Sequence, residues 1–254
     1  MNQEPLPFPA APPPKTALIL DTETNGVDAR PQIIVEVAAI LYSLEFGTPI
    51  ESYSHIIERP SGTISDPTVP RITGIFDDDL RMGGPPTAVW ERVVKMSCAA
   101  DVILAHNVAF DRPLCEADPL FAQNCADYWA KPRPWVCTMT HVEWPDRESG
   151  ASQSLAALAL HYGVGVVSAH RAMADCDILS RTLSRVKELG HDLQALIASA
   201  MVPRVKVQAV VSYEKRDLAK DAGFAWDSDN KRWWREVTAE QRAKLPFGTR
   251  EIKT

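Results

Sequence analysis

Two acids end the first apolar segment of the sequence, in the stretch LILDTETNG at residues 18–26. Asp21 and Glu23 are two positions apart, so a β-strand would point both side chains to the same face. Neighbouring carboxylates repel each other, and burial makes this repulsion more costly. A positive group is therefore expected between them. An Arg, a Lys or a metal ion would each fill that role.

Two later segments supply further titratable groups. Asp111 follows Asn107 by one helical turn, just past a buried segment. His170 and Asp175 lie five positions apart in AHRAMAD, at the start of a predicted long helix. Because helical side chains tilt toward the N-terminus, Asp175 would point back toward the strand ends.

Each of these groups also has a purely structural alternative. Asp111 could be an acid bonded within its own helical turn, and His170 could be an ordinary polar residue at a helix start. Asp177 competes with Asp175, and Glu36 is another acid flanked by apolar residues.

The chemistry of the set favours a metal site. Carboxylate oxygens are the hard ligands that Mg²⁺ and Mn²⁺ select. Four acids could hold two such ions about 3.5–4 Å apart, the arrangement used for in-line phosphoryl displacement. A histidine, which titrates near neutral pH, could then take the proton of the attacking water.

The periodicity of apolar residues predicts the elements that position these groups. Strands are predicted at 16–22, 32–43, 50–58, 101–107 and 135–140. Helices are predicted at 85–100, 154–163, 169–190 and 191–201, with another after Asn107. Residues 59–74 are rich in Pro and Gly and predict a loop. Strands that come first and then alternate with helices favour an α/β fold with a mixed sheet flanked by helices.

Charge divides the chain into two parts. Residues 1–202 contain 15 Lys and Arg against 25 Asp and Glu, a net charge of −10, whereas residues 203–254 contain 12 against 8, a net charge of +4. We therefore expect a body at 16–201 and a small basic α+β module at 203–254. Residues 1–15 contain six prolines and are expected to form a disordered lead-in.

The cysteines and the apolar runs bear on location. There are five cysteines, an odd number, with no C-x-x-C pair, which favours reduced thiols in the cytoplasm over a disulfide framework or a zinc site. No apolar run approaches the roughly 20 residues of a transmembrane helix, and the N-terminus does not have the pattern of a signal peptide.

Three ordered motifs resemble those of the DEDD superfamily of 3′→5′ exonucleases, in its histidine-bearing branch. That branch includes exonuclease X and the proofreading subunit of bacterial DNA polymerase III. LDTETNG resembles the first motif, AHNVAFD the second, and HRAMAD, with four residues between His and Asp, the third. The resemblance covers about 16–190. It implies a ribonuclease H-like fold and a hydrolase that acts on phosphodiester bonds.

The resemblance also implies roles for individual residues. His170 would be the general base. Only Asp175, and not Asp177, fits the spacing of the third motif. Four acids would be catalytic ligands of two Mg²⁺ or Mn²⁺ ions: Asp21, Glu23, Asp111 and Asp175.

Six further residues adjoin the motifs where relatives hold the terminal nucleotide: Thr24, Asn25, Gly26, Thr73, His106 and Asn107. At the first three positions, relatives bring backbone amides to the nucleotide, and RITGIFDDDL at 71–80 resembles the segment that packs beside it. Pro70 stands where many relatives carry a histidine. The grip on the terminal nucleotide is therefore expected to differ.

The basic module sets tryptophans among basic side chains, in SYEKRDLAKDAGFAWDSDNKRWWREV at 212–237. It resembles a small module found on primase-like and plasmid-transfer proteins. Aromatic faces stack on bases and cations contact phosphates. Accessory nucleic-acid contacts are therefore predicted for Lys215, Arg216, Lys220, Lys231, Arg232, Trp233 and Trp234. At least one tryptophan is also expected in the module's core, and the alternative role is docking of a protein.

The sequence thus predicts a metal-dependent 3′→5′ exonuclease that acts on the 3′ end of single-stranded DNA, in DNA repair or proofreading, without a membrane. It would release nucleoside 5′-monophosphates. DNA is preferred because the closest-looking relatives act on DNA. Two alternatives stay open: an RNA-processing exoribonuclease, and a catalytically silent nucleic-acid-binding protein.

Overall fold

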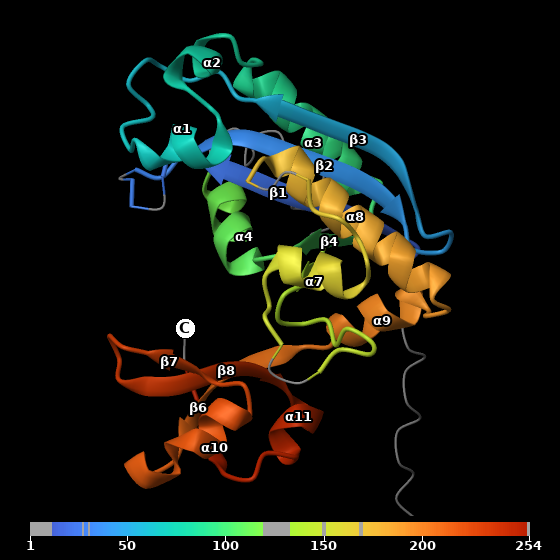
Figure 1. Ribbon diagram of the computed structural model, residues 1–254, viewed down its shortest axis with the longest axis vertical. Helices are drawn as coiled ribbons and strands as arrows, with labels where there is room; N and C mark the ends of the chain where they lie inside the picture. The colour runs from blue at the N-terminus through green and yellow to red at the C-terminus, as the bar shows by residue number, and fades with distance from the viewer. Residues whose placement is uncertain are drawn as a thin grey trace, which may run out of the picture. The chain divides into compact units, whose positions relative to one another are not determined.

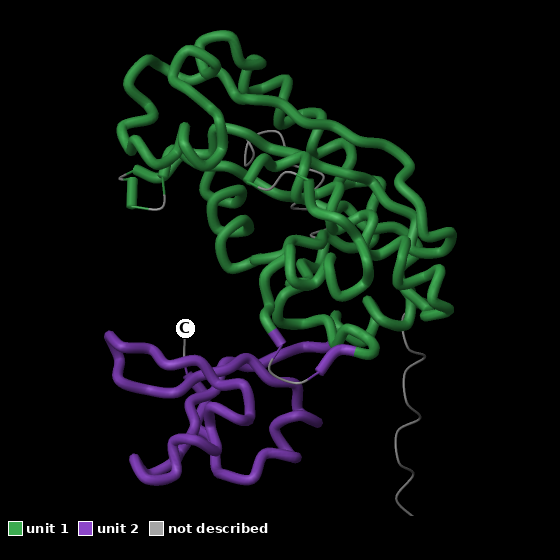
Figure 2. The backbone as a smooth tube through the Cα atoms, in the orientation of Figure 1, with its two compact units in different colours: residues 1–146, 152–201 green, residues 147–151, 202–254 purple. Residues whose placement is uncertain are grey.

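The structure is a computed structural model that describes residues 12–26, 28–29, 31–118, 133–148, 151–167 and 170–252. Most of the predicted lead-in at 1–15 lies outside these residues. The chain divides into a large unit, Met1–Asp146 with Ser152–Met201, and a small unit, Arg147–Ala151 with Val202–Thr254 (Figure 2). Within the described ranges, no helix combines the length and the apolar character that crossing a membrane requires.

A five-stranded mixed sheet organises the large unit, in the order β3-β2-β1-β4-β5 (Figure 1). The strands are β1 Thr16–Thr24, β2 Ile34–Ser43, β3 Thr48–Ile56, β4 Val102–Ala105 and β5 Trp135–Cys137. The first three pair antiparallel, whereas β4 pairs parallel to β1 and to β5. The predicted α/β class and mixed sheet are confirmed.

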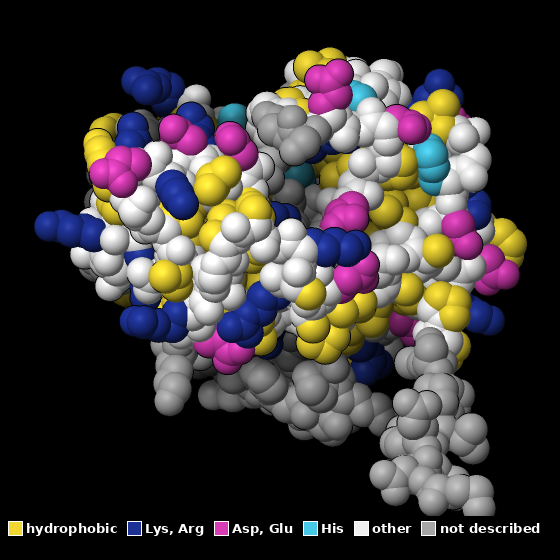
Figure 3. All heavy atoms as spheres, turned by 90° about the horizontal axis from the view of Figure 1, so that it is seen from below, with side chains coloured by type: hydrophobic (Ala, Val, Ile, Leu, Met, Phe, Trp, Pro, Cys, Tyr) yellow, Lys and Arg dark blue, Asp and Glu magenta, His cyan; other side chains and the backbone are white. Residues whose placement is uncertain are grey.

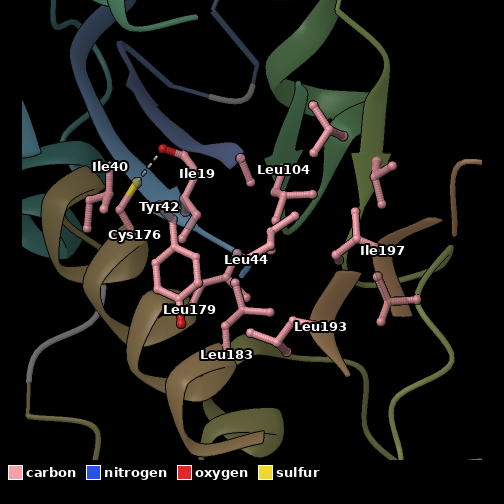
Figure 4. Packing of buried hydrophobic residues seen from close by; sticks show 14 of the residues in the cluster. Ile19, Ile40, Tyr42, Leu44, Leu104, Cys176, Leu179, Leu183, Leu193 and Ile197 are labelled. Atoms are coloured by element: carbon pink, nitrogen blue, oxygen red, sulfur yellow. Dashed lines mark hydrogen bonds between the residues drawn. The ribbon is translucent and has the colours of Figure 1, made fainter. Parts of the chain in front are cut away.

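Helices cover both faces of this sheet. Ala17 and Ile19 face a core formed with α7, α8 and α9, and Figure 4 shows side chains of α8 and α9 packed there. Leu18 and Leu20 face the other core, which contains side chains of α3 and α4. The helices are α1 Thr68–Thr73, α2 Asp77–Arg81, α3 Pro86–Cys98, α4 Val108–Ala117, α7 Leu155–His161, α8 Ala172–Glu188 and α9 Leu193–Ala200.

Two predicted boundaries were wrong. The stretch at 59–74 is not all loop, because α1 occupies its last third and ends at Gly74, whose φ of 71° is left-handed. Pro67 just before it and Pro70 inside it concealed a helix that is only six residues long. The predicted helix at 169–190 begins only at Ala172. His170 therefore precedes the helix rather than lying in its first turn.

The small unit is a four-stranded antiparallel sheet of order β7-β8-β6-β9 with short helices on one side. Its core is formed by Val207, Ala209, Ala219, Phe224 and Val237. The last strand, Gly248–Glu251, was not predicted from the sequence. The elements are β6 Arg204–Val210, η1 Tyr213–Lys215, α10 Arg216–Asp221, β7 Ala225–Asp227, β8 Arg232–Thr238, α11 Ala239–Ala243 and β9 Gly248–Glu251.

Candidate active site

The carboxyl end of β1 carries the first two acids. Side chains alternate along a strand, so Asp21 and Glu23 continue the row of Ala17 and Ile19 toward the face that α8 covers. The pairing of β1 with β4 ends at Ile19, whereas its pairing with β2 continues to Thr24. The acids therefore lie where β1 has lost its parallel neighbour, at the sheet edge where α/β proteins commonly bind ligands.

The third acid comes from the first turn of α8. Cys176 is buried, and its thiol lies 3.8 Å from the carbonyl oxygen of Ile19 and 3.6 Å from that of Ala38, which fixes this turn against the sheet (Figure 4). The adjacent Asp175 then reaches the β1 acids. Asp21, Glu23 and Asp175 each offer a carboxylate oxygen, and these oxygens all lie within 4.8 Å of one another. We call these three residues the acidic group.

Asp111 approaches from the other face of the sheet. It is buried on α4, and its Oδ1 accepts hydrogen bonds from the backbone N–H of Thr22, at 3.1 Å, and from the Thr22 hydroxyl, at 2.8 Å. Asp111 is thus outside the acidic group, but its hydrogen bonds connect it to β1 at Thr22, between Asp21 and Glu23. The side-chain bonds of Asp111 to Thr22 therefore connect α4 to β1, which a purely local helix-turn acid would not do.

Burial and electrostatic repulsion raise the pKa values of the two acids of β1. Burial raises the pKa of Asp21 well above its usual value, and the charges of Asp111 and Asp175 raise it further. Burial and the charge of Asp175 raise the pKa of Glu23 to about 7, while the guanidinium of Arg171 lowers it. Without a cation, the site therefore favours protonated acids.

The pKa values of Asp111 and Asp175 are also raised, although hydrogen bonds to these two carboxylates oppose the effect of burial. Burial raises the pKa of Asp111 to about 6, although the hydrogen bonds from Thr22 lower it. Burial also raises the pKa of Asp175, against the backbone N–H of His170. A bound cation would hold all four carboxylates in their charged form, so the donor set fits a divalent metal.

His170 lies beside the acidic group at the surface. Its backbone N–H donates to Oδ2 of Asp175 at 3.3 Å, and the residue is exposed. Its φ of 65° is in the left-handed region, which a residue with a β-carbon rarely adopts. Such strain persists where the surroundings require a particular side chain at that position. The competing acid Asp177 is exposed and forms an ion pair with Arg181 instead.

The sequence analysis missed the role of one buried ion pair. Glu36 is 2% exposed and lies opposite Glu23 on β2. Its carboxylate accepts two hydrogen bonds from Arg171, at 3.0 and 2.7 Å, and one from the backbone N–H of Ala172, at 3.1 Å. Glu36 therefore fixes the start of α8 on β2, close to His170. A lone acid within an apolar strand was the available signal, but its partner is 135 residues away.

Replacing Glu36 with Gln should reduce kcat by roughly tenfold or more, because small misplacements of reacting groups are costly. Gln keeps the shape but loses the charge that holds Arg171 and the start of α8. The control is Asp177→Asn, which removes an exposed charge from the same helix. Steady-state rates on a short oligonucleotide measure the effect. Equal rates for the two variants would show that the ion pair does not position the site.

The residues predicted to contact the terminal nucleotide after the first motif are engaged within the protein. The backbone N–H of Asn25 donates to the Ile33 carbonyl at 3.0 Å, and its side-chain Oδ1 accepts from the Ile33 N–H at 2.8 Å. The N–H of Gly26 donates to Thr24 Oγ1 at 3.4 Å. A Cβ on Gly26 would come within 3.3 Å of Asp66. The structure thus shows a closely packed turn at 24–26.

Of the remaining predicted substrate residues, Thr73 lies in α1, whereas His106 and Asn107 lie between β4 and α4. Thr73 is buried, and its hydroxyl donates to the Val69 carbonyl at 2.9 Å, within α1. The ring of His106 lies 3.0 Å from Thr138 Oγ1 and donates through Nε2 to the Gln153 carbonyl at 2.8 Å. Asn107 is exposed and precedes α4. Their roles toward a nucleotide stay predictions.

The predicted accessory residues of the small unit do not form one surface. Lys215, Arg216 and Lys220 are on η1 and α10, and Lys231 is in the turn before β8. Trp233 packs against the core, as expected for at least one tryptophan. Arg232 and Trp234 alternate with Trp233 along β8 and point to the opposite face of the sheet. Arg232 forms an ion pair with Asp227 at 3.1 Å.

A mixed sheet with helices on both faces, and acids gathered at the end of its central strand, defines a nuclease of ribonuclease H-like fold. The exonuclease family model (RNase_T) matches residues 18–183, and the chain belongs to that family. The match contains all three motifs and all four acids. Residues 205–252 match a second family, described as a domain of unknown function (DUF8626).

Individual relatives agree with this assignment. A Mycobacterium tuberculosis protein named as a bifunctional exonuclease/endonuclease is 29% identical over 196 residues, which cover 72% of this chain and 29% of the relative. Escherichia coli exonuclease I, bound to single-stranded DNA and zinc, has a TM-score of 0.58 at 20% identity, over 82% of this chain and 50% of that one. The nuclease domain of 3′hExo, a DEDDh family member bound to rAMP, gives 0.52 at 13%, over 70% and 94%.

These comparisons confirm the resemblance to DEDD exonucleases for the large unit. The chain spans less than a third of the length of the Mycobacterium relative and half of the length of exonuclease I. The similarity of the small unit to modules of primase-like and plasmid-transfer proteins stays a prediction.

Proposed function

We propose that this exonuclease removes nucleotides one at a time from the 3′ end of single-stranded DNA and releases nucleoside 5′-monophosphates. The observation that carries the proposal is the convergence of Asp21, Glu23 and Asp175 within 4.8 Å, with Asp111 bonded to the strand between the first two. No stabilising role explains four buried or half-buried carboxylates with raised pKa values in one place.

The four acids would hold two Mg²⁺ or Mn²⁺ ions. When bound, such ions supply charge stabilisation at the phosphate and a water activated for attack. Asp21, Glu23 and Asp175 would be the direct donors, because their oxygens converge. Thr22 orients the carboxylate of Asp111 through Oδ1 and so sets the direction of its second oxygen.

The protein's own proton acceptor would be His170. The residue is exposed, and its side chain is near enough to Asp175 to lower the pKa of that acid, so an imidazole nitrogen could take a proton from the attacking water. The water oxygen forms a bond to phosphorus, and the bond from phosphorus to the 3′ oxygen of the preceding nucleotide breaks. That oxygen gains a proton and becomes the new 3′ hydroxyl. The phosphate remains bonded to the 5′ oxygen of the released nucleotide.

The preference for DNA and the location of the protein are parts of the same proposal. DNA is supported by the motif resemblance, and Escherichia coli exonuclease I shares the fold in its complex with single-stranded DNA. A reducing, cytoplasmic setting is supported by Cys98, Cys115, Cys137 and Cys176, which are free thiols.

The test is the polarity of digestion. Oligonucleotides of DNA and RNA, single-stranded or duplex, would carry a blocking group on either the 3′ or the 5′ end. With Mg²⁺ or Mn²⁺ we expect shortening of single-stranded DNA from a free 3′ end, mononucleotide products with a 5′ phosphate, and no reaction in excess chelator. Equal digestion of 3′-blocked strands, or full activity in chelator, would contradict the proposal. Faster digestion of RNA would overturn the choice of DNA.

A further inference from the structure

The two faces of the small sheet differ in their packing against the helices that the structure describes in this unit. Val207 and Ala209 of β6 face the core with Ala219 of α10, so the intervening residues of β6 point to the other side. Among the described residues of the small unit, the core that contains side chains from helices is on the Val207 side alone. We call the opposite side the open face.

The open face carries a row of side chains across all four strands. The pairing registers place Ala225 opposite Trp234, Trp234 opposite Gln208, and Gln208 opposite Arg250. Residues directly opposite in antiparallel strands share a face, and neighbouring strands are about 4.8 Å apart. An indole, an amide and a guanidinium therefore stand in one line of about 10 Å, which is two strand spacings.

The aromatic member of this row is held beside a cation. The ammonium of Lys206 lies 4.0 Å from the centroid of the Trp234 ring. The neighbour of Trp234 on β7 is Ala225, whose methyl group is too short to cover an indole. The indole thus has a cation on the β6 side and little cover on the β7 side.

Charge on the open face is predominantly positive. Lys206 and Arg250 are basic, and Arg250 is exposed without an ion pair among the described residues. Arg232 is offset by its ion pair with Asp227, and the remaining acid is Glu236 opposite Lys206. On the face drawn in Figure 3, Lys and Arg are interspersed with Asp, Glu and hydrophobic side chains.

We propose that the open face binds a single strand of nucleic acid. A base would stack on Trp234, Lys206 and Arg250 would contact phosphates on the β6 and β9 side of this ring, and the amide of Gln208 would bond to a base edge or sugar. An aromatic ring with cations beside it is the arrangement that binds single-stranded nucleic acid. The choice of nucleic acid as occupant rests on the proposed function, and the face would hold the same strand away from its reacting end.

Only some of the residues predicted from sequence to contact nucleic acid lie on the open face. Trp234 belongs to the open face, whereas Trp233 is part of the core and Trp226 shares its side of the sheet, with ring centroids 5.5 Å apart. Lys215 and Lys220 belong to the helical layer on that side. Lys206, Gln208 and Arg250 were not predicted.

The test is binding by the full chain, with hydrolysis blocked by chelator. The probes are fluorescein-labelled 30-mers of dT and of rU. Trp234→Ala should weaken binding about tenfold for one lost stacking contact. Arg250→Ala should weaken it severalfold at low salt and reduce the salt slope by about 0.7. The matched controls are Trp226→Ala and Lys220→Ala, which remove an indole and a cation from the other side and should bind as the wild type does.

Two further measurements separate this inference from the catalytic proposal. Melting temperatures of all four variants verify folding, and the rate on a trinucleotide with Mn²⁺ reports the active site independently of binding by the open face. Loss of binding in Trp234→Ala and Arg250→Ala alone supports the open face even if the wild type hydrolyses nothing. Unchanged affinities for both probes would overturn it, in favour of a protein or a second copy of this chain as the occupant. Equal losses in the controls would also overturn it.

Discussion

Replacing Asp21 with Asn is expected to reduce hydrolysis by roughly 10³-fold or more, because several kcal/mol of charge stabilisation at the phosphate depend on this set of carboxylates. Asn keeps the size of the side chain and can still occupy the carboxyl end of β1. It loses the negative charge that faces Glu23 and Asp175. Single-turnover digestion of a short oligonucleotide measures the loss.

The same variant should be more stable than the wild type when no metal is present. Repulsion from Asp111 and Asp175 raises the pKa of Asp21, so removal of its charge relieves an unfavourable interaction. A gain of about 1 kcal/mol would raise the melting temperature by about 2–4 °C. Asp177→Asn, on the surface of α8, serves as the control. A clear fall in the metal-free melting temperature of Asp21→Asn would show that this acid stabilises the fold.

Replacing His170 with Ala is expected to lower kcat by roughly 10²–10⁴-fold, the usual effect of losing a general base. The affinity for Mn²⁺ should change little, because the side chain is not one of the converging oxygen donors. The dependence of the residual rate on pH should lose the limb that belongs to an imidazole. This combination distinguishes a base from a residue that holds the site together.

The exposed histidine His161 on α7 provides the matched control, since His161→Ala removes the same ring from another helix of the large unit. His170→Gly adds a second test. Glycine adopts positive φ without penalty, so this variant should be more stable than His170→Ala while equally inactive. Near-normal rates in both variants would place the base elsewhere.

The part of the site that depends on local spacing could be predicted from the sequence. The two-residue spacing of Asp21 and Glu23 fixes their common face once a strand forms. The preference for Asp175 over Asp177 came from motif spacing, and the structure places only Asp175 in the acidic group. The mixed sheet followed from the order of strands and helices.

The parts that depend on long-range contacts could not be predicted. Asp111 reaches β1 through Thr22, 89 residues away, and from the face opposite the acidic group. The role of Glu36 is visible only when Arg171 is brought to it. In the small unit, tryptophans that are adjacent in sequence alternate between the core and the open face. These tryptophans were predicted to share one surface, because composition does not show which face of the sheet each side chain occupies.

The central claim is that the acidic group is a site for divalent cations, and thermal melting with and without Mn²⁺ tests it most directly. The pKa of Glu23 is raised to about 7 in the folded protein, so the stability that its proton confers is lost as pH rises through that value. Metal-free protein should therefore melt at a lower temperature at pH 8 than at pH 5.5. Mn²⁺ should restore stability, and more at pH 8, where the carboxylates are charged. The restoration should be much smaller in Asp21→Asn. A melting temperature at pH 8 that does not respond to saturating Mn²⁺ would contradict the claim.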